Sequence, residues 1–279
     1  MQVNINNIHI RMEIPDDYHA VEELTRDAFW KTFWNMGQVI CDEHLLVHLL
    51  RKTDTFIPEL SLVAECGSRL LGHIIYSKGK VVEDSGVSHD LLTFGPLSVH
   101  PSYQGMGIGK LLLQESFRYA KSLGYRGVII FGHPDYYTRF GMRPAAEYGI
   151  TTSDGKSFDS FMAYPLYDGA LDGISGKFNL PDVYKSLTQE EAIEFDKRFP
   201  KKQPHKLVPI DVLLERLEPT ASEAVKKLNF SCLAEMQTKS TREMINLDGI
   251  NDNALATIRN VMNEHSMHWG KSDTTATIG

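Results

Sequence analysis

A short glycine-rich run at residues 104–109 separates an apolar stretch, residues 91–99, from an amphipathic stretch, residues 110–122. This order predicts a strand, a glycine turn and the start of a helix. Glycines let the backbone approach a ligand closely, and the free N–H groups at the start of a helix attract negative charge. The run therefore predicts a binding site for a pyrophosphate group.

Two other phosphate-binding glycine loops can be compared with this run. A Walker loop ends in Gly-Lys-Ser/Thr, whereas Lys110 is followed by Leu111. A Rossmann loop has the pattern Gly-x-Gly-x-x-Gly and an acidic residue about 20 residues further on. The run fits neither pattern well, and a tight turn before a helix, with no ligand, stays an alternative.

The order Gln-x-x-Gly-x-Gly, filled by Gln104, Gly107 and Gly109, resembles the acetyl-CoA signature of the GNAT acyltransferase superfamily. Residues 95–101 look like the central strand of that superfamily and its exit. Residues 126–132 form a short apolar run bounded by glycines, as expected of a second, parallel strand. In GNAT folds these two strands splay apart and leave a cleft for the thioester end of the cofactor. The resemblance implies an α/β (α+β) fold with a mixed central sheet.

The resemblance also implies which residues bind acetyl-CoA. The backbone of the central strand holds the pantetheine arm, and the glycine loop holds the pyrophosphate. A backbone N–H of residues 97–99 would hold the oxyanion that forms during transfer. The implied cofactor-binding residues are Leu97, Ser98, Val99, Gln104, Gly105, Met106, Gly107, Ile108, Gly109 and Lys110.

Residues 136–142 resemble the Tyr-x-x-x-Gly-Phe element of the superfamily, with Tyr137 at the tyrosine and Met142 where phenylalanine is usual. By that match, Tyr137 is the catalytic residue that protonates the departing thiolate of coenzyme A. A phenol with a pKa of about 10 suits this role, because a thiolate has comparable basicity. Tyr136 is a rival for the same role, and a tyrosine packed in the core is the structural alternative.

Transfer to an amine also needs a group that accepts a proton. In many GNAT enzymes this base is an acidic residue on or beside the central strands, but residues 92–99 contain none. The candidates on neighbouring segments are Glu65, Glu83, Asp84 and His133. Each of them has a structural or solvent-exposed role as its alternative.

The resemblance narrows to small bacterial N-acetyltransferases and covers about residues 8–200. Residues 56–65 and 71–77 look like their second and third strands. A first strand is expected at residues 8–15, a helix capped by Asp17 through about residue 34, and a second helix at residues 42–52. These helices build the acceptor side in GNAT folds. Four aromatic residues are expected to line the acceptor pocket or the core: Phe29, Trp30, Phe33 and Trp34.

The last part of the chain predicts a separate helical domain. We expect a GNAT domain at residues 1–200, a linker at 201–208 and a helical domain at 209–279. Helical patterns at residues 228–236, 241–246 and 253–264 resemble a helix-hairpin-helix unit and the C-terminal domain of the bacterial RNA polymerase alpha subunit.

The DNA-binding function of that polymerase domain does not carry over with the pattern. Thr220 and Glu223 replace its DNA-contacting arginine and asparagine, while Asn251 and Asn253 replace its hairpin glycine and a nearby lysine. The module is also slightly acidic, which disfavours nucleic acid as a partner. Self-association or binding of another protein is the expected role.

Composition adds few constraints. The net charge of -7 disfavours a polyanionic partner. No apolar run reaches the roughly 18 residues of a membrane span, and residues 1–11 do not resemble a signal peptide, so a cytoplasmic location is expected. Cys41, Cys66 and Cys232 predict neither a disulfide framework nor a zinc site, and no metal is expected. Acetylation of Cys66 before transfer remains an alternative to direct transfer.

Two functions follow. The first is an acetyl-CoA-dependent N-acetyltransferase that moves an acetyl group directly to a primary amine of a small molecule or to an exposed amino group. The second is a noncatalytic acyl-CoA-binding module that signals through the C-terminal domain. Tyr137 and the loop glycines favour the first, and the missing base on the central strand keeps the second open.

Overall fold

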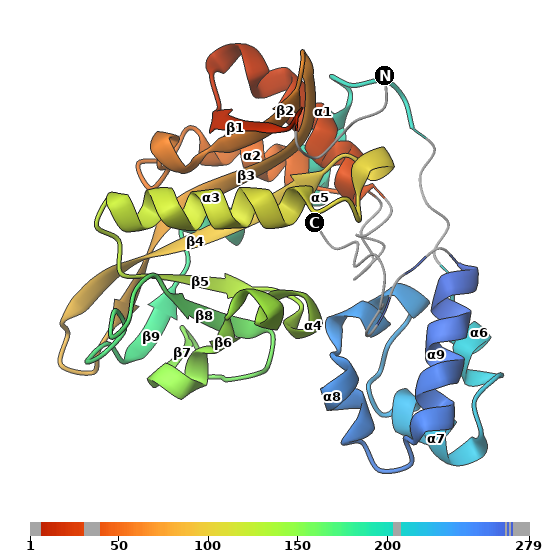
Figure 1. Ribbon diagram of the computed structural model, residues 1–279. Coiled ribbons are helices and arrows are strands. Elements are labelled where there is room, and N and C mark those ends of the chain that lie inside the picture. The colour runs from red at the N-terminus through yellow and green to blue at the C-terminus, as the bar shows by residue number, and fades with distance from the viewer. Residues whose placement is uncertain (1–6, 31–39, 203–207, 266, 268, 270–279) are drawn as a thin grey trace.

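The computed structural model describes residues 7–30, 40–202, 208–265, 267 and 269 (Figure 1). Its largest element is a nine-stranded sheet. The main path runs, in spatial order, through β1 (His9–Met12), β2 (Leu62–Cys66), β3 (Arg69–Val82), β4 (Ser88–Val99), β5 (Gly127–Phe131), β8 (Phe161–Pro165) and β6 (Arg143–Pro144). Off this path, β9 (Gly176–Asn179) pairs with β3 and with β7 (Ile150–Thr152).

The pairing is mixed. Neighbouring strands from β1 to β4 are antiparallel, β4 and β5 are parallel, and β8 is antiparallel to both β5 and β6. A helix, α3 (Ile108–Ser122), connects the parallel pair, because a tight hairpin cannot return the chain in the same direction. The prediction of an α/β fold with a mixed central sheet is confirmed.

Helices cover both faces of this sheet. Successive side chains of a strand point to opposite faces. Leu62 and Ile74 pack into the core that contains α3 residues, whereas Val63 and Ile75 pack with residues of the first two helices. Figure 1 shows α3 crossing in front of the strands. The other helices of this part of the chain are α1 (Tyr18–Phe29), α2 (Glu43–Leu50), α4 (Pro134–Tyr137) and α5 (Gln189–Asp196).

The start of α1 differs from the sequence prediction. No side-chain hydrogen bond of Asp17 caps the helix. The Asp17 carboxylate instead accepts a hydrogen bond from the Ile14 backbone N–H at 2.9 Å and another from Arg11 at 2.6 Å. It therefore fixes the segment before the helix to β1. The helix ends at Phe29, and the continuation expected to residue 34 falls on residues 31–39, outside the described ranges.

The C-terminal helices have a hydrophobic core of their own, with Leu213, Val225, Met236, Ile258 and Met262 among its buried members. Side-chain caps start two of these helices: Ser240 accepts from the Glu243 N–H at 3.1 Å, and Asn251 accepts from the Ala254 N–H at 2.9 Å. The helices are α6 (Asp211–Leu214), α7 (Pro219–Lys226), α8 (Thr241–Ile245) and α9 (Asp252–Glu264).

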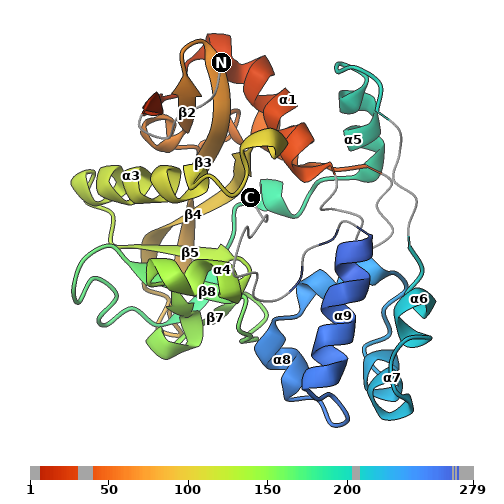
Figure 2. The ribbon, with the colours of Figure 1, turned by 45° about the vertical axis from the view of Figure 1, so that its right-hand side comes forward.

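The helix expected at residues 228–236 is wrong. Asn229 adopts a positive φ of 55°, and a short 3-10 turn, Leu233–Thr238, replaces only the last four residues of the expected helix. Cys232 forms an isolated β-bridge with Pro209. Figure 2 shows the C-terminal helices beside the sheet domain, with α8 nearest to α4. Within the described residues, no helix is both long and apolar enough to cross a membrane.

Candidate active site

The glycine run forms the turn between β4 and α3. Gly105 and Gly107 have positive φ values of 77° and 84°, a conformation that favours glycine, and Gly107 is the residue that precedes the first helical turn. The side-chain amide of Gln104 donates a 3.1 Å hydrogen bond to the Val99 carbonyl, which holds the loop against the end of β4. The first N–H groups of α3 lack partners within the helix, as at any helix start. The loop thus presents free donors beside β4.

Gly109 lies at a close approach between the glycine loop and α4. A Cβ atom at this position would lie 2.8 Å from the Tyr136 hydroxyl, and within 4 Å of Leu97 and Val99 side-chain atoms. The glycine loop, the end of β4 and α4 therefore meet at one point. Lys110 and Met106 are exposed, while Ile108 and the Ser98 side chain are buried. The Ser98 hydroxyl donates a 3.0 Å hydrogen bond to the Thr25 hydroxyl of α1, so only the Ser98 backbone is left to contact a ligand.

A cavity of about 230 Å³ opens where β4 and β5 separate. The register pairs these strands at Leu92 and Val128, and the cavity lies on the side of their carboxyl ends. The pairing of β3 with β4 is also interrupted between Ile74 and Tyr76, opposite Gly95 and Pro96. The cavity lining is Phe29, Glu43, Leu46, Thr93, Phe94, Gly95, Pro96, Leu97, Phe131, Gly132, His133, Tyr137, Leu180 and Tyr184.

The two neighbouring tyrosines of α4 face different parts of this region. Tyr137 lines the cavity and packs on Phe94, with 5.8 Å between ring centroids. Its pKa is raised well above the usual value, mainly by burial, so the phenol keeps its proton. Tyr136 instead lies under the glycine loop, with the Arg139 guanidinium 4.2 Å from its ring centroid.

Of the four base candidates read from the sequence, His133 alone is among the cavity-lining residues. Glu65 accepts a hydrogen bond from Arg11, and Glu83 bonds His89 near the β3–β4 turn. Burial lowers the pKa of His133. The negative charges of Asp135 and Glu243 act in the other direction but do not cancel the effect of burial. His133 is therefore neutral at pH 7, and its Nε2 atom is enclosed without a partner among the described residues.

Glu43 is an acidic residue of the cavity that the sequence reasoning missed. It lies half-buried at the first turn of α2. Burial and, secondarily, the neighbouring charge of Asp42 raise its pKa to about 8. Its charge also contributes to the raised pKa values of Tyr137 and Tyr184, which places the three groups within electrostatic reach of one another. The available signal was its position at the start of a helix already expected to build the acceptor side.

The opposite wall of the cavity comes from the segment between β9 and α5. The Tyr184 hydroxyl lies 3.3 Å from the Gly95 carbonyl and 3.1 Å from the Ser77 hydroxyl. This contact supports β4 at the point where its pairing with β3 is interrupted. Of the aromatic residues expected near the acceptor, Phe29 lines the cavity and Trp30 packs on Arg26, whereas Phe33 and Trp34 lie outside the described residues. Cys66 is not among the lining residues.

Comparisons with known proteins agree with this arrangement. Residues 23–142 match the model of the acetyltransferase (GNAT) family. Over 168 residues the chain is 30% identical to the N-acetyltransferase YhbS of Escherichia coli, a match that covers 60% of this chain and 92% of that protein. The chain belongs to the GNAT family of N-acetyltransferases.

Two solved structures resemble this GNAT N-acetyltransferase. Escherichia coli YhbS in complex with CoA superposes with a TM-score of 0.55 at 26% identity, over 65% of this chain and 94% of that one. A GNAT acetyltransferase of Brucella melitensis in complex with acetyl-CoA superposes with a TM-score of 0.50 at 27% identity, over 63% and 97% of the two chains. A further relative, YjhQ of Escherichia coli, is 36% identical over 103 residues, which are 55% of its length.

Proposed function

We propose that this N-acetyltransferase uses acetyl-CoA as its donor and transfers the acetyl group directly to a primary amine in the cavity between β4 and β5. The observation that carries the proposal is the junction at Gly109, where the glycine loop, the end of β4 and α4 meet beside Tyr137. Two relatives of the same family have been solved with CoA or acetyl-CoA bound. The localisation that we propose is the cytoplasm.

The shape of the loop suits the pyrophosphate of coenzyme A. Positive φ values at Gly105 and Gly107 turn the backbone so that N–H groups of Gly107, Ile108 and Gly109 are available at the start of a 15-residue helix. The exposed Lys110 adds positive charge. We assign the backbone of Leu97, Ser98 and Val99 to the pantetheine arm, and Gln104, Gly105, Met106, Gly107, Ile108, Gly109 and Lys110 to the pyrophosphate.

Acetyl-CoA supplies an activated acetyl group as a thioester. Tyr137 holds a proton at its buried hydroxyl and donates it to the departing sulfur. Glu43 accepts a proton from the amine, because its pKa of about 8 lies near neutral pH, where a general base is most effective. His133 is the second candidate for this role, supported by its place in the cavity lining and by its lowered pKa, which keeps the imidazole neutral.

The cavity favours an amine without an anionic group. Aromatic and aliphatic side chains form most of its wall, and neither lysine nor arginine occurs among the described lining residues. A substrate carboxylate or phosphate would therefore be buried without a cationic partner, which is costly. The volume of about 230 Å³ is small for a ligand site. We infer an acceptor that is a small apolar amine or one amino group inserted from a larger molecule.

The C-terminal helices form a second domain in this proposal, with boundaries at residues 1–200, 201–208 and 209–279. Support comes from their separate hydrophobic core. The capped helices α8 and α9 and the short connection between them support the resemblance to a helix-hairpin-helix unit and to the polymerase alpha C-terminal domain. We assign this domain a role in protein binding or self-association rather than in nucleic-acid binding.

Calorimetry with acetyl-CoA tests the donor site. The natural chain is expected to bind with a Kd of roughly micromolar size, about −8 kcal/mol. Gly107→Glu should abolish binding, because its carboxylate repels the pyrophosphate. Gly107→Gln is the matched control for the strain of a side chain at φ 84°, and it should retain more affinity than the glutamate variant. Equal affinities of the two variants would contradict the assignment of the loop.

A thiol-release assay with a panel of amines then tests turnover. Release of free coenzyme A with apolar amines, and not with amino acids of similar size, supports both the reaction and the acceptor class. Binding of acetyl-CoA with no thiol release from any amine would favour the alternative function, a noncatalytic acyl-CoA-binding module that signals through the C-terminal domain.

A further inference from the structure

A second hollow lies between α4 and the C-terminal helices. Its volume is about 550 Å³, within the usual range of small-molecule sites. Asp135 lines it from α4, while the remaining walls come from α8 and α9. The residues of those helices are Thr241, Arg242, Ile245, Asp252, Leu255 and Arg259. None of these residues lines the acceptor cavity.

Arg259, which lines this hollow, carries a hydrogen-bond donor without an acceptor among the described residues. Its Nε atom is buried and bonds no described residue. The described residues also provide no ion pair for Arg259 or Arg242, although both belong to a domain with many acids. A buried guanidinium donor without an acceptor costs free energy. Arg259 as a whole is half-buried and lines the hollow, so an oxyanion would pair with its terminal Nη groups, with the two-pronged geometry that arginine and a carboxylate share.

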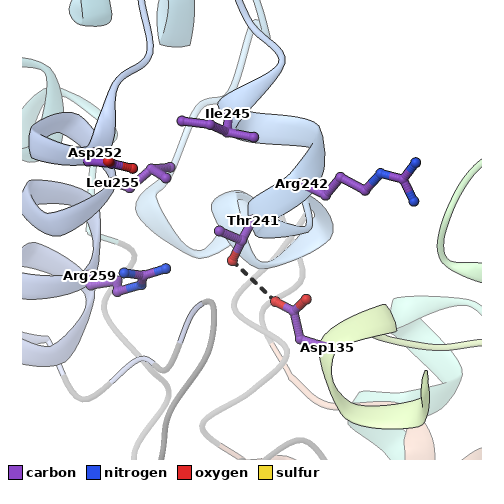
Figure 3. Close-up of a pocket in the computed structure, with 7 residues that line it drawn as sticks. All are labelled: Asp135, Thr241, Arg242, Ile245, Asp252, Leu255 and Arg259. Carbon is purple, nitrogen blue, oxygen red and sulfur yellow. Dashed lines mark hydrogen bonds between the residues drawn. The ribbon is translucent and has the colours of Figure 1, made fainter. Parts of the chain in front are cut away.

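The other residues that line the hollow limit the charge and polarity of a ligand that could bind there. In Figure 3, Arg259 extends from α9 toward Thr241 and Asp135, whereas the Arg242 side chain extends to the other side of α8. Asp135 and Asp252 disfavour a multiply charged anion, and the Asp135 carboxylate can accept a hydrogen bond from a ligand donor. Leu255 and the partly exposed Ile245 offer apolar contact.

We propose that this hollow binds a small carboxylate that carries an adjacent hydrogen-bond donor and an apolar chain, and that the ligand regulates acetyl transfer through α4. The carboxylate pairs with Arg259, the donor faces Asp135, and the chain packs on Leu255 and Ile245. A hydroxy acid and an amino acid share this chemistry. The binding site is independent of the proposed function, whereas its regulatory effect rests on it.

The route to the transferase site is short. The Thr241 hydroxyl donates a 3.2 Å hydrogen bond to Asp135 (Figure 3). Asp135 lies 4.0 Å from His133 Nδ1, in the same turn that carries Tyr137. The charges of Asp135 and of Glu243, from α8, both act on His133. A ligand that engages Asp135 therefore changes the electrostatic environment of a residue in the acceptor cavity.

Binding is tested on the full chain by calorimetry without acetyl-CoA. The probes are 2-hydroxy-4-methylpentanoate, its uncharged amide, leucine and inorganic phosphate. The hydroxy acid is not an amine, so it cannot act as an acceptor. We expect the hydroxy acid or leucine to bind at least tenfold more tightly than the amide, and the comparison of these two probes identifies the preferred donor. Equal binding of the amide, tighter binding of phosphate, or no binding by either acid would overturn the assignment.

Arg259→Gln should weaken the binding of the hydroxy acid at least tenfold. Arg216→Gln is the matched control, because Arg216 belongs to the same domain but pairs with Glu264 outside the hollow. Thermal unfolding of both variants shows whether they are folded. Unchanged affinity in a folded Arg259→Gln chain contradicts the site.

Regulation is tested by two readouts. Saturating hydroxy acid should change kcat/KM for an amine at least threefold in the natural chain, and less in Thr241→Val, which lacks the hydroxyl bonded to Asp135. The bound hydroxy acid should also shift the titration of His133 measured by NMR, and this measurement does not need turnover. Binding that depends on Arg259 but changes neither kcat/KM nor the His133 titration would overturn the regulatory role. A shifted His133 titration in a chain that shows no turnover would support the link between the hollow and His133, and would contradict the proposed function instead.

Discussion

Glu43 of α2 and Tyr137 of α4 line one cavity, and the charge of the carboxylate contributes to the raised pKa of the phenol. The two groups are suited to opposite tasks. Glu43 can take up a proton near pH 8, while Tyr137 holds its proton over the whole neutral range. Burial, and after it the charges of neighbouring groups that include Glu43, raise the pKa of Tyr137 and keep the phenol protonated before transfer, as a proton donor to the departing thiolate requires.

Replacing Tyr137 by phenylalanine should remove this proton donor without disturbing the loop. We expect kcat to fall roughly 100-fold, the lower end of the range for general acid catalysis, with the KM for acetyl-CoA within a factor of two. Steady-state kinetics with a good amine acceptor measure both. Tyr136→Phe is the matched control and should lose less than tenfold in kcat, because its hydroxyl faces Gly109 rather than the cavity. Equal losses would assign the proton to Tyr136 or to solvent.

The pH dependence of turnover should identify the base. The basic form of Glu43 accumulates as the pH rises through about 8, so kcat should increase up to that pH and then level off. Glu43→Gln should remove this limb. Should His133 be the base, the limb would lie below pH 6.5, because burial lowers the pKa of His133, and it would persist in Glu43→Gln. Asp42→Asn is a useful control, since loss of its charge should move the limb to lower pH.

The same pKa shift has a consequence for stability. The folded-state pKa of Glu43 is raised, so the native chain binds the proton more tightly than the unfolded chain does. The protonated Glu43 side chain contributes fully to the free energy of unfolding below the unfolded-state pKa, about 4.3, and this contribution is lost as the pH rises through about 8. At pH 9, Glu43→Gln should be more stable than the natural chain by roughly 2 kcal/mol, about half of the full shift because the side chain is half-buried. Urea unfolding at pH 5 and pH 9 checks this difference, which should be small at pH 5.

Local patterns predicted the secondary structure around the glycine loop, and the family resemblance added the expected roles of its residues. The glycines of the loop, the helix after it and the tyrosine element all lie within one stretch of sequence, and the structure places Leu97, Gly109 and Tyr137 around one region. Backbone conformation near glycines and the periodicity of α3 are short-range properties. The sequence therefore predicted the strand, the glycine turn and the helix of this region, while the binding of the donor by these residues stays a prediction.

The acceptor side depends on packing between distant segments. Glu43 and Tyr184 reach the cavity from α2 and from the segment after β9, and no local pattern states that these segments meet. The helix expected at 228–236 failed for a related reason. The Ile210 N–H bonds the Ser231 carbonyl at 3.2 Å, so pairing with a distant strand-like segment competes with helix formation there.

A pair of substitutions should reveal the contact between the loop and α4. Gly109→Ala places a Cβ atom 2.8 Å from the Tyr136 hydroxyl, so either the loop or the ring must shift. Overpacking of this kind costs about 1–3 kcal/mol, and we expect weaker acetyl-CoA binding as well. Tyr136→Phe should restore part of both losses in the double variant. Additive effects in the cycle, measured by urea unfolding and calorimetry, would show that the two residues do not interact.

The ion pair between Arg26 and Asp196 should fix α5 to α1. The Arg26 side chain is 1% exposed, its Nη2 donates to Asp196 Oδ2 at 2.8 Å, and His44 lies 3.2 Å from the same carboxylate. Asp196→Ala leaves a buried guanidinium without its acid, so we expect a loss of about 3 kcal/mol in the free energy of unfolding. The exposed Glu190 on the same helix provides the control, and Glu190→Ala should change stability by less than about 0.5 kcal/mol. Because these partners lower the pKa of Asp196, the difference between Asp196→Ala and the natural chain should shrink as the pH falls below about 4. A difference that is equal at pH 3 and pH 7 would show that packing, rather than charge, holds α5 in place.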